Sequence, residues 1–327
     1  MMMKQFLWFG LTALFTATSA CSGDGESNHS TSSGGAGVGG AGGAGVGGAG
    51  VGGAGVGGGS ATVFGDDRPV ELHVPDNYDA ATPAPLLILL HGYTATGTVQ
   101  NFYFGMQAVA NNHGMLYAYP DGTVDDNGDQ FWNATDACCN FFGSPVDDSA
   151  YLNKLIDDIS GAYNVDPKRI YFVGHSNGGF MSYRMACDHA DKVAAIASLA
   201  GATYKDPTQC APSEPVNVLQ IHGTADATIK YNGGNNVGLV YPSVQETIDY
   251  WAGVAACDIN APTDGGMIDI DGSIAGDETT VTRYETGCVA GGSATLWSMA
   301  GSGHVPQPLS ATFAEQVVTY LLAHPKP

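Results

Sequence analysis

A serine flanked by two glycines is the first feature of this chain whose residue types and spacing could support chemistry. Ser176 lies in the stretch GHSNG, after the apolar residues 170–173 and before a segment with a helix-like apolar side. A chain with 47 glycines can produce this spacing by chance. A strand, a tight turn and a helix, however, form the setting that exposes a nucleophilic serine, and glycines leave room around it. The sequence therefore predicts that Ser176 is a nucleophile.

A serine hydroxyl needs a base within hydrogen-bond reach and an acid that orients this base. Asp226 lies just past the end of the apolar run 216–223, although an aspartate there could instead only form a turn or cap a helix. Asp249 is a second candidate, but it falls inside a predicted helix. His304 follows a strand on a glycine-flanked loop. The chain order Ser176, Asp226, His304 is the one expected for a serine, acid and base in a strand-turn-helix setting.

The remaining histidines are weaker candidates for the base. His91 and His222 end buried apolar runs, where they are expected to bond the backbone of neighbouring loops. His175 lies next to the serine and is predicted to line the substrate pocket.

Stabilising the negative oxygen of a tetrahedral intermediate requires hydrogen-bond donors. The backbone N–H groups of Asn177, directly after the serine, and of Tyr93, after the run LLILLHG, are the expected donors. The aromatic side chains of Tyr93, Trp132 and Tyr231 are predicted to contact substrate, with core packing as the alternative for each of them.

Apolar runs that alternate with helix-like stretches must position these residues. This alternation predicts an α/β fold, a mostly parallel sheet with helices on both faces, whose sites gather beyond the carboxyl ends of the strands. The predicted strands are residues 85–92, 115–120, 169–174, 193–201 and 216–223, and the predicted helices lie within 147–164, 177–187, 242–257 and 310–324.

The N-terminal residues differ in composition from the rest. Residues 1–21 carry Lys4, an apolar run and small residues before Cys21, as in an export signal with a lipoprotein-type processing site. Residues 22–60 contain an AGVGG-like repeat that predicts a flexible linker, and residues 61–327 have the composition of one globular domain. The predicted location is secreted or, through a lipid on Cys21, attached to the outer surface of a bacterium.

The charge and the cysteine content limit the kinds of partner and of metal site that are expected. The net charge of −21, from 32 acidic and 11 scattered basic residues, argues against nucleic acid and anionic membranes as partners. Six cysteines besides Cys21 predict disulfides in an exported domain, without fixing their pairing, and their spacing does not favour zinc. No metal or cofactor is expected.

The stretches LLHG, YPDG, FWNATDACC, VDDSAYLNKLIDD, GHSNGGFMSYRMAC and IHGTADATIKYNGG together resemble the secreted polyhydroxybutyrate depolymerase-like and feruloyl esterase-like α/β-hydrolases. The resemblance implies the α/β-hydrolase fold and the roles of nucleophile, acid and base for Ser176, Asp226 and His304. It also implies a disulfide between Cys257 and Cys288. Cys187 with Cys210 is the next expected pair, which leaves Cys138 and Cys139 bonded to each other or to partners elsewhere.

The chain departs from that family in two places. HVPQPL follows His304 where a Thr-Trp-Pro-Gly-like stretch is usual, and residues 258–280 replace a shorter spacer. The aspartates of this insertion, Asp269 and Asp271 among them, lack the pattern of an EF-hand and are expected in solvated turns.

The expected function is that of a serine esterase acting on an ester substrate, possibly a polymer. Feruloyl esters, acetylxylan and polyhydroxyalkanoates are the alternatives within this class, and a non-catalytic surface binding module is the alternative outside it.

Overall fold

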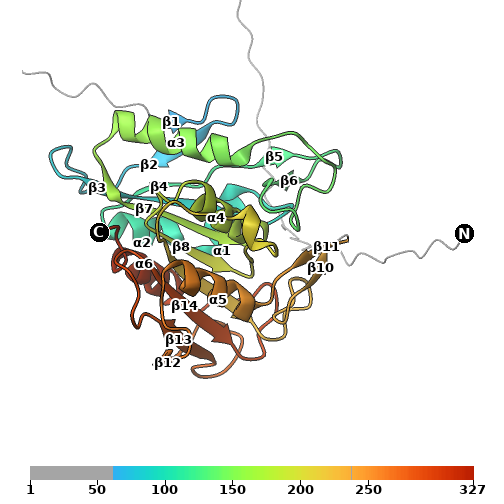
Figure 1. The fold of residues 1–327 in the computed structure, drawn as a ribbon. Coiled ribbons are helices and arrows are strands. Elements are labelled where there is room, and N and C mark those ends of the chain that lie inside the picture. The colour runs from blue at the N-terminus through green and yellow to red at the C-terminus, as the bar shows by residue number, and fades with distance from the viewer. Residues whose placement is uncertain (1–61, 237) are drawn as a thin grey trace, which may run out of the picture. The chain divides into compact units, whose positions relative to one another are not determined.

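The computed structural model describes residues 62–236 and 238–327, which are arranged around a ten-stranded sheet (Figure 1). The expected signal segment 1–21 with Cys21 and the expected linker 22–60 lie outside the described residues. The strand order is β1-β2-β4-β3-β7-β8-β9-β14-β13-β12. The strands are β1 (Val63–Phe64), β2 (Val70–His73), β3 (Ala84–Leu90), β4 (Leu116–Ala118), β7 (Val165–His175), β8 (Ala195–Leu199), β9 (Asn217–Gly223), β12 (Thr263–Ile268), β13 (Thr279–Tyr284) and β14 (Ser293–Met299).

The centre of the sheet is parallel and its two edges are antiparallel. Strands β4, β3, β7, β8, β9 and β14 pair in parallel, whereas β1 and β2 at one edge and β13 and β12 at the other pair antiparallel. Two short hairpins stand apart from this sheet, β5 (Thr123–Val124) with β6 (Gln130–Phe131) and β10 (Gly234–Asn236) with β11 (Leu239–Tyr241).

Helices cover both faces, as the alternation of strands and helices predicts. The core on one face includes residues of α3 (Asp148–Ala162), α4 (Asn177–Asp188) and α5 (Val244–Val254). The core on the other includes residues of α1 (Gly97–Phe104), α2 (Met106–Asn112) and α6 (Phe313–Leu322). A 3₁₀ turn at Pro207–Gln209 adds a short element.

Every strand and helix expected from the apolar runs is confirmed, with small shifts at the ends. The central strands β3, β7, β8 and β9 are completely or almost completely buried along their apolar parts, which explains their continuous apolar runs. The carboxyl ends of β3, β7, β9 and β14 therefore meet at one edge of the sheet and bring the predicted site residues together.

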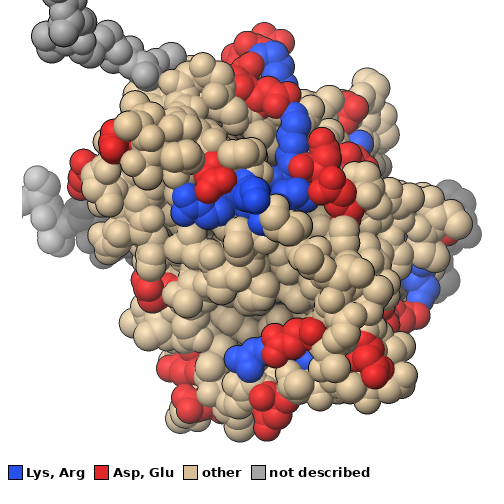
Figure 2. All heavy atoms as spheres, turned by 60° about the vertical axis from the view of Figure 1, so that its left-hand side comes forward, with Lys and Arg blue, Asp and Glu red and all other residues tan. Residues whose placement is uncertain are grey.

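Basic and acidic side chains adjoin one another on the surface. On the face drawn in Figure 2, Lys and Arg side chains gather near the middle and lie beside Asp and Glu side chains. Ion pairs link Lys192 to Asp157 at 2.6 Å and Arg169 to Asp166 at 2.6 Å. These two basic side chains therefore lie beside negative charge.

Among the helices of the described residues, none has the length and apolar character needed to cross a membrane.

Candidate active site

Ser176 occupies the sharp turn between β7 and α4. Its backbone has φ 52° and ψ −117°, a conformation that is strained for a residue with a side chain. Its N–H donates to Leu199 O at 2.8 Å, and its carbonyl accepts from the N–H of Phe180 at 3.0 Å. The turn is thus fixed from the neighbouring strand and from the helix that it begins.

The two glycines that flank the serine are required by close backbone contacts. A Cβ atom on Gly174 would lie 2.1 Å from Gly178 O, and one on Gly178 would lie 2.2 Å from Leu90 O. Side chains at either position would push the turn away from the sheet, which explains the spacing of the motif.

The structure brings Ser176, His304 and Asp226 into one hydrogen-bonded chain. His304 Nε2 lies 2.9 Å from Ser176 Oγ, and His304 Nδ1 lies 2.7 Å from Asp226 Oδ2. An Nδ1–H that donates to the carboxylate leaves Nε2 free to accept the serine proton. The second candidate acid, Asp249, instead accepts from Gln245 on the surface of α5. The arrangement can activate a serine hydroxyl as a nucleophile.

The carboxylate of Asp226 is buried and fully engaged. Oδ1 accepts the backbone N–H groups of Thr228 and Ile229 at 2.8 and 2.9 Å, so the residue forms a turn and binds the imidazole at the same time. His222 Nε2 lies 3.3 Å from Oδ2. Burial alone would raise the pKa of Asp226, but the imidazoles of His222 and His304 outweigh it and hold that pKa well below its usual range.

The other histidines at the strand ends bond loop backbone, as expected. His91 Nδ1 lies 2.8 Å from Gly92 O, and His91 Nε2 accepts the N–H of Gly122 at 2.8 Å. His222 Nε2 lies 2.7 Å from Ile229 O. These bonds occupy both rings in holding loops around the site.

The expected oxyanion donors lie on either side of the serine. Tyr93 follows Gly92, whose added Cβ would lie 3.6 Å from Ser176 Cβ, and Asn177 is the first residue of α4. Among the residues that the structure describes, the backbone N–H groups of Tyr93 and Asn177 have no hydrogen-bond acceptor. Both are therefore available to a bound oxygen, and the N-terminal end of α4 favours negative charge there.

Trp132 packs in the core, which is the alternative to the predicted substrate contact. Its side chain is completely buried in the core, and its indole N–H donates to His91 O at 3.1 Å. The Asn177 side chain holds the backbone of Trp132 on both sides, with Trp132 N–H to Asn177 Oδ1 at 2.7 Å and Asn177 Nδ2 to Trp132 O at 2.9 Å. Trp132 thus links the segments that carry the two expected oxyanion donors.

Tyr231 is likewise absent from the lining of the pocket. Its hydroxyl lies 3.0 Å from Ser298 Oγ, and its ring packs edge-on against His222. Tyr231 therefore supports the side of the site that holds Asp226.

The pocket at the serine has a volume of about 270 Å³. Of the predicted contacts, Tyr93 and His175 line it. Sequence reasoning missed the contribution of α1, whose helix starts at the N-cap Thr96. That Thr, with polar and aromatic residues after it, is the signal that could have revealed the helix. The other lining residues are Gly92, Ala95, Val99, Gln100, Tyr103, Val305 and Gln307, with Ser176 and His304.

A second cavity of about 670 Å³ adjoins this pocket and shares Val99, Tyr103 and Gln307 with it. Phe102, which is 89% exposed, lies on its rim, and Pro308 and Leu309 form part of its wall. The segment after His304 therefore lines both cavities. Tyr103 fixes that segment by donating to Pro306 O at 2.8 Å.

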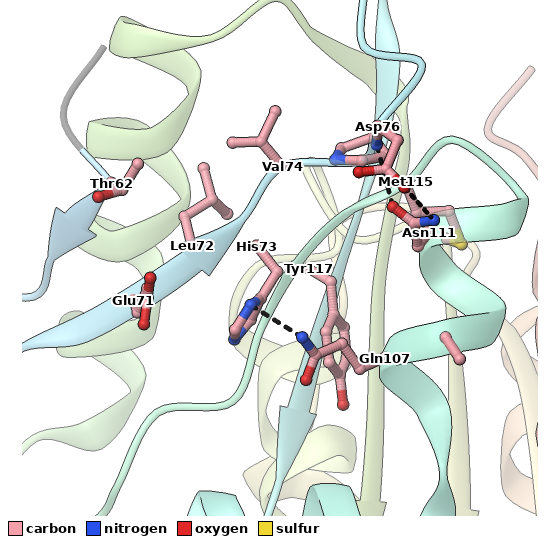
Figure 3. Close-up of a pocket in the computed structure, with 12 residues that line it drawn as sticks. Thr62, Glu71, Leu72, His73, Val74, Asp76, Gln107, Asn111, Met115 and Tyr117 are labelled. Atoms are coloured by element: carbon pink, nitrogen blue, oxygen red, sulfur yellow. Dashed lines mark hydrogen bonds between the residues drawn. The ribbon is translucent and has the colours of Figure 1, made fainter. Parts of the chain in front are cut away.

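A larger cavity, about 710 Å³, lies elsewhere, between β2 and α2 (Figure 3). Gln107 extends toward His73 there, with Nε2 3.1 Å from His73 Nδ1. Its lining includes neither Ser176 nor His304. Size alone does not identify it as the candidate active site, because Ser176 and His304 line the smaller pocket.

The insertion at residues 258–280 departs from its predicted structure. It contributes the edge strand β12, and Asp271 is 2% exposed instead of solvated. Asp271 Oδ2 accepts from the Ser302 hydroxyl at 2.6 Å. The described residues contain no group of three or more His, Cys, Asp or Glu side chains that could hold a metal ion.

Three disulfides are present in the structure. Cys257 is joined to Cys288 and Cys187 to Cys210, which are the expected pairs, and Cys138 is joined to its neighbour Cys139. The Cys257–Cys288 bond ties the start of the insertion to the segment that leads into β14.

The fold is that of the α/β-hydrolases. The acetyl xylan esterase from Aspergillus awamori has a similar structure, with a TM-score of 0.56 and 18% sequence identity, over 80% of this chain and 97% of that one. At this identity the likeness concerns the fold.

Two curated relatives have related sequences. Feruloyl esterase B of Piromyces equi is 32% identical over 200 residues, which cover 58% of this chain and 36% of that protein. Poly(3-hydroxyalkanoate) depolymerase C of Paucimonas lemoignei is 32% identical over 142 residues, which cover 42% of this chain and 32% of that protein. The chain thus spans about a third of the length of either relative.

A family model described as "Putative esterase" matches residues 61–235, more than half of the chain. This range contains β7, the turn at Ser176 and Asp226. The chain therefore belongs to this esterase family.

Proposed function

We propose that this protein is an extracellular serine carboxylic-ester hydrolase. The observation that carries the proposal is the hydrogen-bonded chain from Ser176 Oγ through His304 to Asp226, with links of 2.9 and 2.7 Å. The strained turn at Ser176 supports the same reaction, as do the backbone N–H groups of Tyr93 and Asn177, which have no acceptor among the described residues.

In the first half of the proposed reaction, His304 Nε2 takes the hydroxyl proton while Ser176 Oγ bonds to the carbonyl carbon of the ester. The tetrahedral intermediate carries its negative charge on the former carbonyl oxygen. His304 then gives the proton to the alcohol oxygen, the ester C–O bond breaks, and the alcohol leaves an acyl group on Ser176.

Water completes the cycle. His304 takes a proton from the water as its oxygen attacks the acyl carbon, and then returns a proton to Ser176 Oγ as the carboxylic acid departs. Asp226 holds the imidazole in orientation and stabilises its charged form in both halves. The N–H groups of Asn177 and Tyr93 receive the oxyanion each time, and losing one such donor in other hydrolases costs about 10²- to 10³-fold in rate.

The pocket and its neighbouring cavity indicate the kind of ester. The 270 Å³ pocket accepts a small or flat group, and the cavity beyond Tyr103 offers an apolar path for a longer one. The names of two relatives, feruloyl esterase B and poly(3-hydroxyalkanoate) depolymerase C, describe esters of this kind. We assign the substrate to esters with an apolar or aromatic portion, including polymeric ones. Acetylated xylan is the second candidate, because an acetyl group fits the small pocket.

Export fits the chemistry of the chain. Residues 1–21 have the features of an export signal, and disulfides persist in oxidising compartments. The proposal places the protein outside the cell, secreted or held by a lipid on Cys21.

A panel of esters tests the proposed function. The full chain is assayed on p-nitrophenyl acetate, methyl ferulate, acetylated xylan and polyhydroxybutyrate, with Ser176→Ala as the control. We expect hydrolysis of at least one ester by the wild type, loss of activity in Ser176→Ala, and labelling of Ser176 by a serine-reactive phosphonate. A wild type that hydrolyses no ester and resists the phosphonate would favour the binding module.

A further inference from the structure

Ser302 lies at the junction of the two loops that carry His304 and Asp226. Its carbonyl accepts the N–H of Ala225, the residue before the acid, at 3.0 Å. It precedes the base by two residues and is 1% exposed. Any movement of Ser302 is therefore passed to the base through the backbone and to the acid loop through a hydrogen bond.

The side chain of Ser302 is held by a buried carboxylate from the insertion. Ser302 Oγ donates to Asp271 Oδ2 at 2.6 Å, and the other oxygen of Asp271 accepts the N–H and the hydroxyl of Ser273 at 3.0 and 2.6 Å. Burying a carboxylate is costly unless hydrogen bonds compensate it. Among the described residues Asp271 forms no ion pair, so neutral hydroxyl and amide donors are what hold it.

The segment around Asp271 is itself fixed by Glu278. The N–H groups of Ile270 and Asp271 donate to Glu278 Oε1 at 3.2 and 2.9 Å. The carbonyl of Glu278 accepts the N–H of Ala300, at the end of β14, at 3.1 Å. The anchor of Ser302 is therefore a rigid part of the sheet edge.

The same segment also holds the chain after the base. Ser310 donates its N–H to Ile270 O at 2.8 Å, and its hydroxyl donates to Asp269 O at 2.7 Å. The insertion thus contacts the His304 loop upstream, at Ser302, and downstream, at Ser310. These contacts, on both sides of His304, distinguish residues 258–280 from an insertion that only extends from the surface.

We infer that Asp271 is a positioning residue, which acts through Ser302 to hold His304 at hydrogen-bond distance from Ser176. This inference rests on the proposed function, in which His304 is the base. Residues 258–280 are then part of the active-site support. Small displacements of a catalytic group lower rate strongly, by up to about 10²-fold for 1 Å.

Two serine variants separate positioning from stability. Ser302→Ala removes the link to Asp271. Ser293→Ala removes another buried hydroxyl bond, to Asn217 Oδ1 at 2.8 Å, at the start of β14, the strand that precedes the Ser302 loop. We expect Ser302→Ala to lower kcat about 3- to 30-fold with KM within twofold. Ser293→Ala is expected to keep the wild-type kcat while losing about as much thermal stability as Ser302→Ala. Equal kcat values for the two variants would overturn the inference.

Two variants of Asp271 test the carboxylate itself. Asp271→Asn keeps an oxygen for Ser273 and an N–H for Ser302, whose hydroxyl can accept, so this variant is expected to retain at least about half of kcat. Asp271→Ala loses both links and is expected to match Ser302→Ala. Ser273→Ala removes the other hydroxyl on the same carboxylate and is expected to leave kcat unchanged. A fall in Ser273→Ala as large as in Ser302→Ala would contradict the assigned path.

A spectroscopic measurement makes the test independent of substrate. The proton on His304 Nδ1 that faces Asp226 is followed by NMR in the wild type and the variants. Ser302→Ala and Asp271→Ala are expected to shift or broaden this resonance, and Ser293→Ala and Asp271→Asn to preserve it. If the wild type hydrolyses no ester, the proposed function fails, and the resonance alone then decides whether Asp271 positions His304. An unchanged resonance in Ser302→Ala would overturn the positioning role.

Discussion

His175 Nε2 lies 2.9 Å from the carbonyl oxygen of His304, and the two rings lie 5.2 Å apart. A carbonyl can only accept, so His175 must carry its proton on Nε2 and donate it. His175, the residue before Ser176, therefore binds the backbone of His304, whose ring contacts the Ser176 hydroxyl. The strained turn and the histidine loop are fastened to each other directly, without substrate.

The burial of His175 predicts a specific dependence of stability on pH. Burial first, and the neighbouring His304 second, lower the pKa of His175 from 6.5 to about 3. Between these values the unfolded chain binds a proton that the folded protein does not, so this contribution is complete above about pH 6.5 and is lost as the pH falls. One such group changes the free energy of unfolding by up to about 1.4 kcal/mol per pH unit.

His175→Gln tests this dependence, because glutamine can still donate to His304 O but does not titrate. We expect urea unfolding from pH 7 to pH 4 to show a smaller loss of stability in the variant. The slope of its free energy of unfolding against pH should be lower by up to about 1.4 kcal/mol per pH unit, the contribution of one proton. His91 stays in both proteins, so its own titration cancels in the comparison. Identical slopes would show that folding does not change proton binding at His175, so that burial does not lower its pKa.

Asp226→Asn is expected to lower kcat by about 10⁴-fold while KM changes little. An asparagine amide can donate to His304 Nδ1, which leaves the imidazole proton on Nε2, where it blocks acceptance from Ser176. Activity on p-nitrophenyl acetate measures the effect. Asp249→Asn, at the other candidate position, is the matched control and is expected to retain wild-type kcat. A large loss in that control would reopen the choice of acid.

The sequence was sufficient to predict the parallel centre of the sheet and the chain of Ser176, Asp226 and His304. Continuous apolar runs identify the central strands that are buried on both faces. Ser176 directly follows β7, and Asp226 and His304 lie a few residues past the ends of β9 and β14. Because parallel strands present their carboxyl ends at one edge, the position of a residue along the chain is enough to place it there.

The walls of the site could not be predicted in the same way. Trp132 follows a short strand of a separate hairpin, and its burial depends on contacts with His91 and Asn177, which are distant in sequence. Asp271 lies in a stretch whose composition is typical of a solvated turn. Its burial and its hydrogen bond with Ser302 become visible only in the structure. Such contacts are tertiary and leave no local periodic signal.

Trp132→Phe tests the role that the structure gives to this tryptophan. Phenylalanine preserves most of the packing but loses the 3.1 Å bond to His91 O, next to Gly92 and Tyr93. We expect kcat to fall about 3- to 10-fold with KM nearly constant, because an oxyanion donor becomes less well fixed.

The matched control for Trp132→Phe is Tyr93→Phe. It removes the hydroxyl that donates to Asp125 at 2.6 Å on the rim and keeps the backbone N–H. It is expected to change KM more than kcat. Steady-state kinetics on two esters distinguishes the two patterns, and a Trp132→Phe variant with altered KM alone would restore tryptophan as a substrate contact.

Phe102→Ser tests whether the cavity beside the serine pocket binds the longer part of a substrate. Phe102 is 89% exposed on α1, at the rim of the 670 Å³ cavity that shares Val99 and Tyr103 with the pocket. An exposed phenylalanine contributes little to folding but can bury apolar area against a bound chain. We expect kcat/KM to fall about 3- to 10-fold for methyl ferulate or polyhydroxybutyrate oligomers and to stay constant for p-nitrophenyl acetate.

The control for Phe102→Ser is Val63→Ser, which removes an apolar side chain that is 60% exposed on β1 and absent from the lining of both cavities. It is expected to leave every ester unaffected, because it changes surface hydrophobicity without changing the cavity. Equal losses on the short and long esters in Phe102→Ser would place its effect on the helix α1 and the catalytic pocket. A loss confined to the long esters would establish that the distal part of the substrate binds in the cavity beyond Tyr103.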